Sequence, residues 1–212
     1  MKFAFKFILL LAINFSVVFE AAALEEPSLA LELTYNRIEH PNYIVETGTG
    51  LPNPSNGFAL QVEYFPIHQV GKLGISGGLS YFNQTRDFVA LDLADATVNV
   101  WGLSLEGGLV YHADFFVNQI LVPYAKLVPT YILSEQYGRI TRSYSAQFAI
   151  GYTFGVAFLL DILEPGKQNY MERQYGVNNV YLIAEYSQLN LSSTTAQDLS
   201  SKGYRLGLRF EF

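Results

Sequence analysis

The sequence of 212 residues is half hydrophobic, contains 15 Tyr and 16 Phe, and carries a net charge of −6. The negative charge and the absence of a basic patch argue against a nucleic-acid partner. Because the sequence has no cysteine, it excludes a disulfide framework and an acylated N-terminal cysteine.

The N-terminus has the pattern of an export signal. Lys2 and Lys6 precede and flank the start of an apolar run over residues 7–19, which is followed by small residues from Ala21 to Ala23. The run is shorter than the roughly 20 apolar residues that a membrane-spanning helix needs. We therefore predict a signal peptide that is cleaved after Ala23.

Alternation of apolar and small or polar residues dominates the rest of the chain. Phe148, Ile150 and Tyr152, for example, alternate with Ala149 and Gly151. Since a strand places successive side chains on opposite faces, this pattern predicts β-strands. The pattern recurs in eight segments: 29–36, 58–65, 73–81, 101–112, 121–133, 148–158, 180–187 and 203–212.

The fifth segment has the weakest pattern. It places Pro123 and Pro129 on its outward set. Proline lacks a donor for the strand ladder and usually lies at an edge or a bulge. Among the eight segments, this one therefore has the least support for a strand.

The composition of the two faces indicates what each one contacts. One face is apolar, and the other is rich in Gly, Ala and Ser, which fit the narrow interior of a barrel of about eight strands. We predict that residues 24–212 form a closed antiparallel up-and-down transmembrane β-barrel of about eight strands, and residues 1–23 the signal peptide. A soluble β-sandwich or lipocalin-like barrel is the alternative.

Aromatic residues lie near the ends of the predicted strands, where they suit the interfaces of a membrane. They are Tyr35, Tyr64, Tyr81, Tyr111, Tyr186 and Phe212.

The lengths of the connections also fit a membrane barrel, in which long extracellular loops alternate with short periplasmic turns. The first, third, fifth and seventh connections are predicted at 37–56, 83–96, 134–143 and 188–202, and the second and fourth at 66–72 and 113–120. The sixth, at 161–179, is long although it should be a periplasmic turn. It contains either a short helix against the rim or an irregular insertion.

The C-terminal strand from Gly203 to Phe212 carries a resemblance to a known group. With the export signal and the alternation, it resembles the small outer-membrane barrels of the OmpA, OmpX and OmpW type. The resemblance implies an outer-membrane location and a C-terminal signal, ending in Phe212 and including Phe210 and Tyr204, that is read by the barrel-assembly machinery. The resemblance extends over almost all of the predicted mature chain, and it is a likeness of the residue pattern.

Charged residues on the Gly-rich face are predicted to point into the lumen. Buried charges need partners, so we expect the cations to pair with several of the glutamates. One interpretation is an ion-pair network that plugs the barrel; the alternative is a gated path in which the pairs exchange partners. The predicted network contains Glu32, Glu63, Glu106, Lys126, Glu185, Arg205 and Arg209, with Glu211 beside it.

No catalytic or cofactor site is predicted. The three histidines, His40, His68 and His112, fall in different connections or at a strand end, and we expect each to be a solvated loop or rim residue. Their scatter argues against a transition-metal site, and no histidine has a serine beside it on a strand, as a lipid deacylase requires. The acidic stretch that contains Asp92 and Asp95 lacks the spacing of a calcium loop.

The sequence therefore favours an outer-membrane protein with a structural or adhesive role, exercised through its extracellular loops. A pore for small solutes or ions is the first alternative, and a lipid-modifying enzyme is the second. The expected partners are outer-membrane lipids, lipopolysaccharide and the barrel-assembly machinery, and the expected state is a monomer. Apolar residues beside the acids of the third loop could extend the neighbouring strands above the membrane and leave an edge for a partner's strand.

Overall fold

The computed structural model describes residues 28–40, 54–88, 96–116, 119–137, 142–163, 165–191 and 199–212, so the predicted signal peptide and the Asp92 to Asp95 loop lie outside the described residues. The elements of this part are β1 (Leu29–Glu39), β2 (Ser55–Ile67), β3 (Lys72–Phe88), β4 (Ala96–His112), β5 (Leu121–Tyr137), β6 (Arg142–Leu159), η1 (Asp161–Leu163), α2 (Pro165–Tyr175), β7 (Asn179–Leu191) and β8 (Ser201–Glu211).

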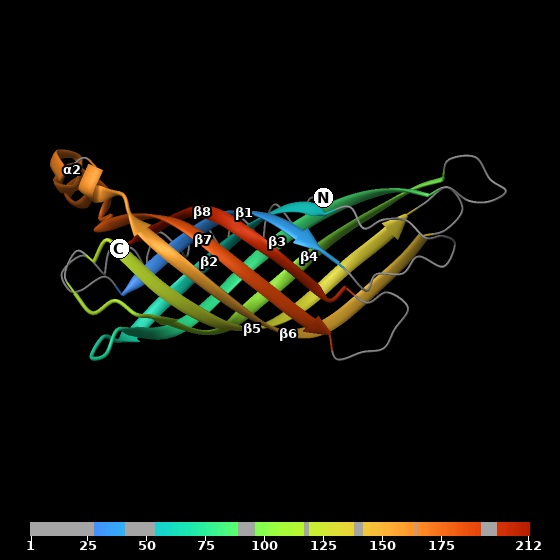
Figure 1. Ribbon diagram of the computed structural model, residues 1–212, viewed down its shortest axis with the longest axis horizontal. Helices are drawn as coiled ribbons and strands as arrows, with labels where there is room; N and C mark the ends of the chain where they lie inside the picture. Colours follow the sequence, from blue (N-terminus) through green and yellow to red (C-terminus); the bar gives the residue numbers. More distant parts are fainter. Residues whose placement is uncertain are drawn as a thin grey trace.

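The strands form a closed barrel in sequence order (Figure 1). Each strand pairs antiparallel with the next, and β8 closes the barrel against β1, with Leu208 opposite Leu33. The prediction of an eight-stranded up-and-down barrel is therefore confirmed. We call the end of the barrel that carries Leu29 and Phe212 the periplasmic end and the opposite end the extracellular end, as in barrels of this class.

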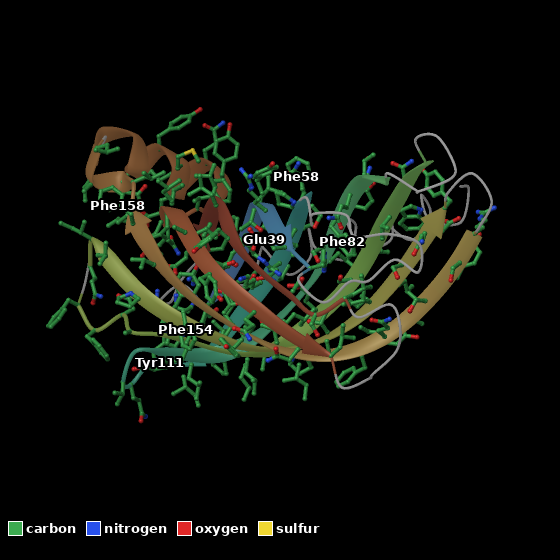
Figure 2. The ribbon with its side chains drawn as sticks, turned by 45° about the vertical axis from the view of Figure 1, so that its right-hand side comes forward. Glu39, Phe58, Phe82, Tyr111, Phe154 and Phe158 are labelled. Atoms are coloured by element: carbon green, nitrogen blue, oxygen red, sulfur yellow. The ribbon has the colours of Figure 1, made fainter. Side chains whose placement is uncertain are left out.

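The two faces of each strand have opposite characters, as the alternation predicts. Leu33, Phe58 and Leu206 point outward, and 53%, 60% and 56% of their surfaces are exposed. The alternate side chains point inward and are mostly buried. In Figure 2, Phe154 lies on the outer surface and Phe82 inside the barrel. A belt of exposed apolar side chains around a filled interior suits hydrocarbon rather than water.

The fifth segment forms a strand of 17 residues, and its ladder with β4 is interrupted only between the pairs Glu106–Thr130 and Leu109–Leu127. Pro123 and Pro129 point outward and keep their register with β6. On the β4 side, a Cβ atom on Gly108 would lie 1.8 Å from the carbonyl oxygen of Leu127. Glycine at this position therefore allows the two backbones to approach closely next to Pro129.

The connection between β6 and β7 contains the helices η1 and α2, so the helical alternative for this segment is correct. The backbone N–H of Gly176 donates to the carbonyl of Glu172 at 3.0 Å, and Gly176 has a φ of +66°. Glycine adopts this left-handed conformation without strain, which explains where α2 ends. None of the helices in the described residues is long and apolar enough to cross a bilayer.

The sheet continues beyond the barrel at the extracellular end. β2 and β3 pair only as far as Asn56 and Asn83, and β6 and β7 only from Ala149 and Leu191. β3, β4, β5 and β6 extend further, as Figure 1 shows. We call this four-stranded extension the extracellular sheet. The third and fifth connections are consequently shorter than predicted, because β3 runs to Phe88 and β5 and β6 extend their ladder to the pair of Tyr137 and Arg142.

Candidate lumenal site

Lys126 lies at the centre of the charged residues in the lumen. Its Nζ atom contacts the carboxylate of Glu32, and it lies 2.9 Å from Glu63 Oε1 and 3.0 Å from Glu185 Oε1. It also donates to Gln61 Oε1 at 3.0 Å. These partners come from β1, β2 and β7, because each is an inward residue of its strand. One ammonium group therefore holds carboxylates from three strands.

A second group of ion pairs leads from this centre to the periplasmic end. Arg209 Nη2 lies 3.5 Å from Glu63 Oε2 and 2.9 Å from Glu211 Oε1. Lys72 Nζ lies 3.0 Å from Glu211 Oε2 and 2.9 Å from Asp114 Oδ2. These contacts join β8 to β2, β3 and the turn after β4.

A third group lies toward the extracellular end and centres on Glu106. Arg205 donates two hydrogen bonds to this carboxylate, each 3.0 Å long. Gln61 Nε2 and Ser80 Oγ donate at 2.6 and 2.7 Å. Because Gln61 also accepts from Lys126, it links this group to the centre. The paired geometry of Arg205 and Glu106 is the strongest form of an arginine–carboxylate contact.

Aromatic rings cover the periplasmic side of the centre. The hydroxyl of Tyr124 donates to Glu185 Oε1 at 2.9 Å, and its ring stacks on His112 with the centroids 4.6 Å apart. The guanidinium of Arg209 lies 5.2 Å from the ring centroid of Phe65 and 5.9 Å from that of Tyr181. These rings exclude water from the charges, which strengthens the interaction of each pair.

The expectation that the histidines are solvated is wrong for two of them. Only 1% of the surface of His112 and 3% of that of His40 is exposed. The alternation that points Glu106 inward also points His112 inward, where its Nε2 lies 3.3 Å from Glu63 Oε2. His68 is half-buried in the turn after β2, where its Nε2 lies 2.7 Å from the carbonyl oxygen of Phe65.

The buried carboxylates outnumber the cations that face them. The charged side chains that the described strands bury in the lumen are Glu32, Glu63, Glu106, Glu185 and Glu211 against Lys72, Lys126, Arg205 and Arg209. Lys72, Lys126 and Arg209 each contact more than one carboxylate, whereas Arg205 pairs with Glu106. Removal of one cation leaves buried carboxylates without a partner and destabilises the fold. Replacement of the whole set of ion pairs by apolar residues would not leave a buried charge without a partner.

Apolar clusters lie on both sides of the charged residues. Toward the extracellular end, Phe82, Val100, Ile132 and Leu199 pack together. Toward the periplasmic end there are two further clusters, made up of Val122, Tyr124, Ala157, Leu159, Tyr181 and Ile183, and of Ala30, Phe65 and Val110. A cavity of about 40 Å³ is lined by the Glu106 and Arg205 pair and by Phe82, Ile132 and Leu199 of the extracellular cluster. This volume suits water molecules.

Ser55 and His40 contact each other at the extracellular end of the lumen. The distance from Ser55 Oγ to His40 Nε2 is 3.2 Å, and His40 Nδ1 lies 3.3 Å from the carbonyl oxygen of Leu199. Both side chains are buried inside the barrel rather than facing lipid. Among the described residues, no group of three or more His, Cys, Asp or Glu side chains could hold a metal ion.

The closed barrel, its apolar outer belt and its charged interior define the molecule as an eight-stranded transmembrane β-barrel. Its fold is that of solved outer-membrane barrels. OprG from Pseudomonas aeruginosa is similar with a TM-score of 0.60 and 11% identity, over 89% of this chain and 97% of OprG.

Two further solved barrels are more distant in shape. Ail, the attachment invasion locus protein of Yersinia pestis, has a TM-score of 0.48 and 17% identity over 89% of this chain and 100% of its own. Neisserial surface protein A has a TM-score of 0.49 and 13% identity over 89% and 100%. No family model and no curated protein matches the sequence.

Proposed function

We propose that the protein is an integral outer-membrane barrel without enzymatic activity, and that it binds other proteins at the cell surface through the extracellular sheet. The observation that carries this proposal is that β6 extends past β7 at the extracellular end. Residues 142–148 pair with β5, and among the described residues the pairing of β6 with β7 begins at Ala149 and Leu191. The edge of a strand that extends past its neighbour presents donors and acceptors to which an extended segment of another protein can add a strand.

The direction of the backbone groups along this edge follows from the neighbouring ladder. The N–H of Leu159 donates to Ile120 on the β5 side, and the N–H of Leu160 donates to Val180 on the β7 side. This direction alternates along a strand, and the pairing of β6 has no register shift. The N–H groups of Tyr144 and Ala146 therefore point toward the open side.

The side chains next to this edge suit an aqueous surface. Tyr144 is 66% exposed, and the Arg142 guanidinium lies 5.1 Å from its ring centroid. Arg142 Nε also donates to Glu135 Oε1. The cation of Arg142 and the ring of Tyr144 lie beside this edge, so they could select among partner strands by the side chains of those strands. β3 likewise extends past β2, since residues 84–88 pair with β4 and the described pairing of β2 with β3 ends at Asn56 and Asn83.

A proline substitution tests the edge directly. Ala146→Pro removes an N–H that faces the open side and leaves the hydrogen bonds to β5 in place, so the barrel should fold. We expect bacteria that display this variant to lose at least tenfold of their adherence to a monolayer of cultured epithelial cells. Adherence is measured as bound bacteria per cell at equal surface amounts of the two proteins.

Ala146→Thr is the matched control, because it keeps the N–H and favours a strand. It should adhere like the unmodified protein. Folding of each variant is checked by the heat-dependent mobility shift of barrels on gels. Equal adherence of a folded Ala146→Pro variant and the Ala146→Thr variant would rule out the β6 edge as the binding surface.

The second candidate function is a narrow pore. It is favoured by the chain of polar contacts that runs from Asp114 through Lys72, Glu211 and Arg209 to Lys126 and on to Arg205. The apolar clusters at both ends of this chain argue for a plug. We therefore propose that the ion pairs stabilise the barrel.

The remaining proposals concern location and assembly. Export by the predicted signal peptide would place the barrel in the outer membrane, in contact with its lipids and lipopolysaccharide, as a monomer. Tyr204, Phe210 and Phe212 are proposed as the signal for the barrel-assembly machinery. In support, the backbone of Phe212 exchanges hydrogen bonds of 2.8 and 3.5 Å with that of Leu29, at the seam where β8 meets β1.

A further inference from the structure

The connection from β6 to β7 is tied to the barrel at both of its ends. The N–H of Leu160 donates to the carbonyl of Val180 at 2.8 Å, and the N–H of Val180 donates to Asp161 Oδ2 at 3.1 Å. After α2, the N–H of Asn178 donates to the carbonyl of Glu211 at 2.8 Å. These bonds hold η1 and α2 beside the periplasmic ends of β6, β7 and β8, as Figure 1 shows.

Large apolar side chains are exposed at this end, beyond the last residues of the strands. Leu163 in η1 is 68% exposed and Ile162 is 41% exposed. In the turn from β4 to β5, Phe115 and Phe116 are 54% and 72% exposed. Exposed apolar residues that gather in one place mark a surface that contacts something other than water.

The two groups belong to neighbouring connections. The N–H of Leu159, at the end of β6, donates to the carbonyl of Ile120, just before β5, at 2.9 Å. From there exposed apolar side chains lead into the outer belt of the barrel, where Leu121 pairs with Phe158 and Phe158 with Leu182. Figure 2 shows Phe158 at the same end of the barrel as α2.

α2 itself presents aromatic residues with polar ends. Tyr170 and Tyr175 are both exposed, and their ring centroids lie 6.3 Å apart. At about 3.6 residues per turn, Glu172 and Arg173 lie on the opposite side of the helix, and both are exposed. Tyrosine and phenylalanine prefer the headgroup level of a bilayer, whereas charged side chains prefer the adjoining water.

We infer that η1, Phe115 and Phe116 after β4, and the tyrosines of α2 form an anchor that rests on the phospholipid headgroups of the periplasmic leaflet. The continuity of these apolar side chains with the lipid-facing belt identifies the occupant as the membrane surface. The anchor rests on the barrel spanning the bilayer and is independent of the partner proposed for the extracellular sheet. It fixes the height of the barrel in the membrane at the periplasmic end.

Single cysteines with an environment-sensitive fluorophore test this anchor, because the natural chain has no cysteine. The variants Leu163→Cys and Phe116→Cys are labelled and refolded into phosphatidylethanolamine and phosphatidylglycerol vesicles. Leu206→Cys is the control for hydrocarbon and Glu172→Cys the control for water. Folding is checked by heat-dependent gel mobility.

We expect the labels at 163 and 116 to emit at shorter wavelength than the label at 172. We also expect lipids with a quencher at the headgroup to reduce their emission at least twofold. Emission like that of position 172, without quenching, would overturn the anchor, because these side chains would then be in water. A label at 206 that also reports water would overturn the anchor together with the spanning barrel.

Discussion

Replacement of Lys126 by methionine should destabilise the folded barrel by about 3–5 kcal/mol, the usual cost of removing one partner from a buried ion pair. Methionine has a similar length, but it leaves Glu32, Glu63 and Glu185 facing one another without the ammonium that contacts all three. Unfolding by urea in lipid vesicles measures the free energy, with the single tryptophan, Trp101, as the fluorescent reporter.

Two further variants separate the charge from the loss of side-chain volume. Leu127→Met changes the neighbouring lipid-facing residue and should cost less than about 1.5 kcal/mol, as a near volume-conserving exchange does. Addition of Glu32→Gln and Glu185→Gln to Lys126→Met should recover much of the lost stability, because two of the three carboxylates are then neutral amides and Glu63 keeps its contact with Arg209. A cost below about 1 kcal/mol for Lys126→Met would place these carboxylates in a hydrated channel, as for an exposed pair.

Leu206→Arg should cost about 2–4 kcal/mol, the range for arginine on the lipid face near the midplane of a bilayer. Leu206 lies in the middle of β8, points outward and is opposite Tyr35 of β1. The substitution is destabilising because it places a guanidinium in hydrocarbon without a counterion. The same urea unfolding measurement gives the free energy.

Asn190→Arg is the matched control. Asn190 also points outward and is exposed, but it lies one residue before the extracellular end of β7. Arginine near the interface costs only about 0–1 kcal/mol. Equal costs at both positions would mean that the apolar belt does not lie in a bilayer.

The fold was predictable because one periodicity determines it. In β6, the alternation of Phe148, Ile150 and Tyr152 with Ala149 and Gly151 fixes which side faces outward, and a slip of one residue would reverse every side chain. The same alternation, read in eight segments, gave the number of strands. The structure also places every charge of the predicted lumenal network inside the barrel, for the same reason.

The sequence could not supply the register that brings particular charges together. Lys126 and Glu32 are in contact although they are 94 residues apart in the sequence. A local sequence pattern does not predict a contact between residues so far apart. Lys72, Asp114 and Gln61 were missed as partners of the network, although the alternation already placed Gln61 on the same face of its strand as Glu63. In β2, Gln61 and Glu63 share the inward face, so the signal was present and was not used.

The sequence analysis also failed to predict the burial of the histidines and left open whether the sixth connection is helical, for different reasons. His112 was assigned to the rim because it ends β4, but its inward parity and the contact with Glu63 bury it. The choice between helix and irregular chain at 161–179 depended on Gly176 and on ties to β7 and β8. The extracellular sheet depends on unequal strand lengths, which loop composition does not determine.

Single-channel conductance tests the central claim, that the barrel is closed by its ion pairs and apolar clusters and works through its surface. A protein of residues 24–212, without the predicted signal peptide, is refolded and inserted into planar bilayers, and heat-dependent gel mobility confirms folding. We predict a folded barrel without discrete openings, before and after Arg205→Met. Regular openings in the unmodified barrel that change when Arg205 or Lys126 is neutralised would contradict the plug and establish a path through the lumen.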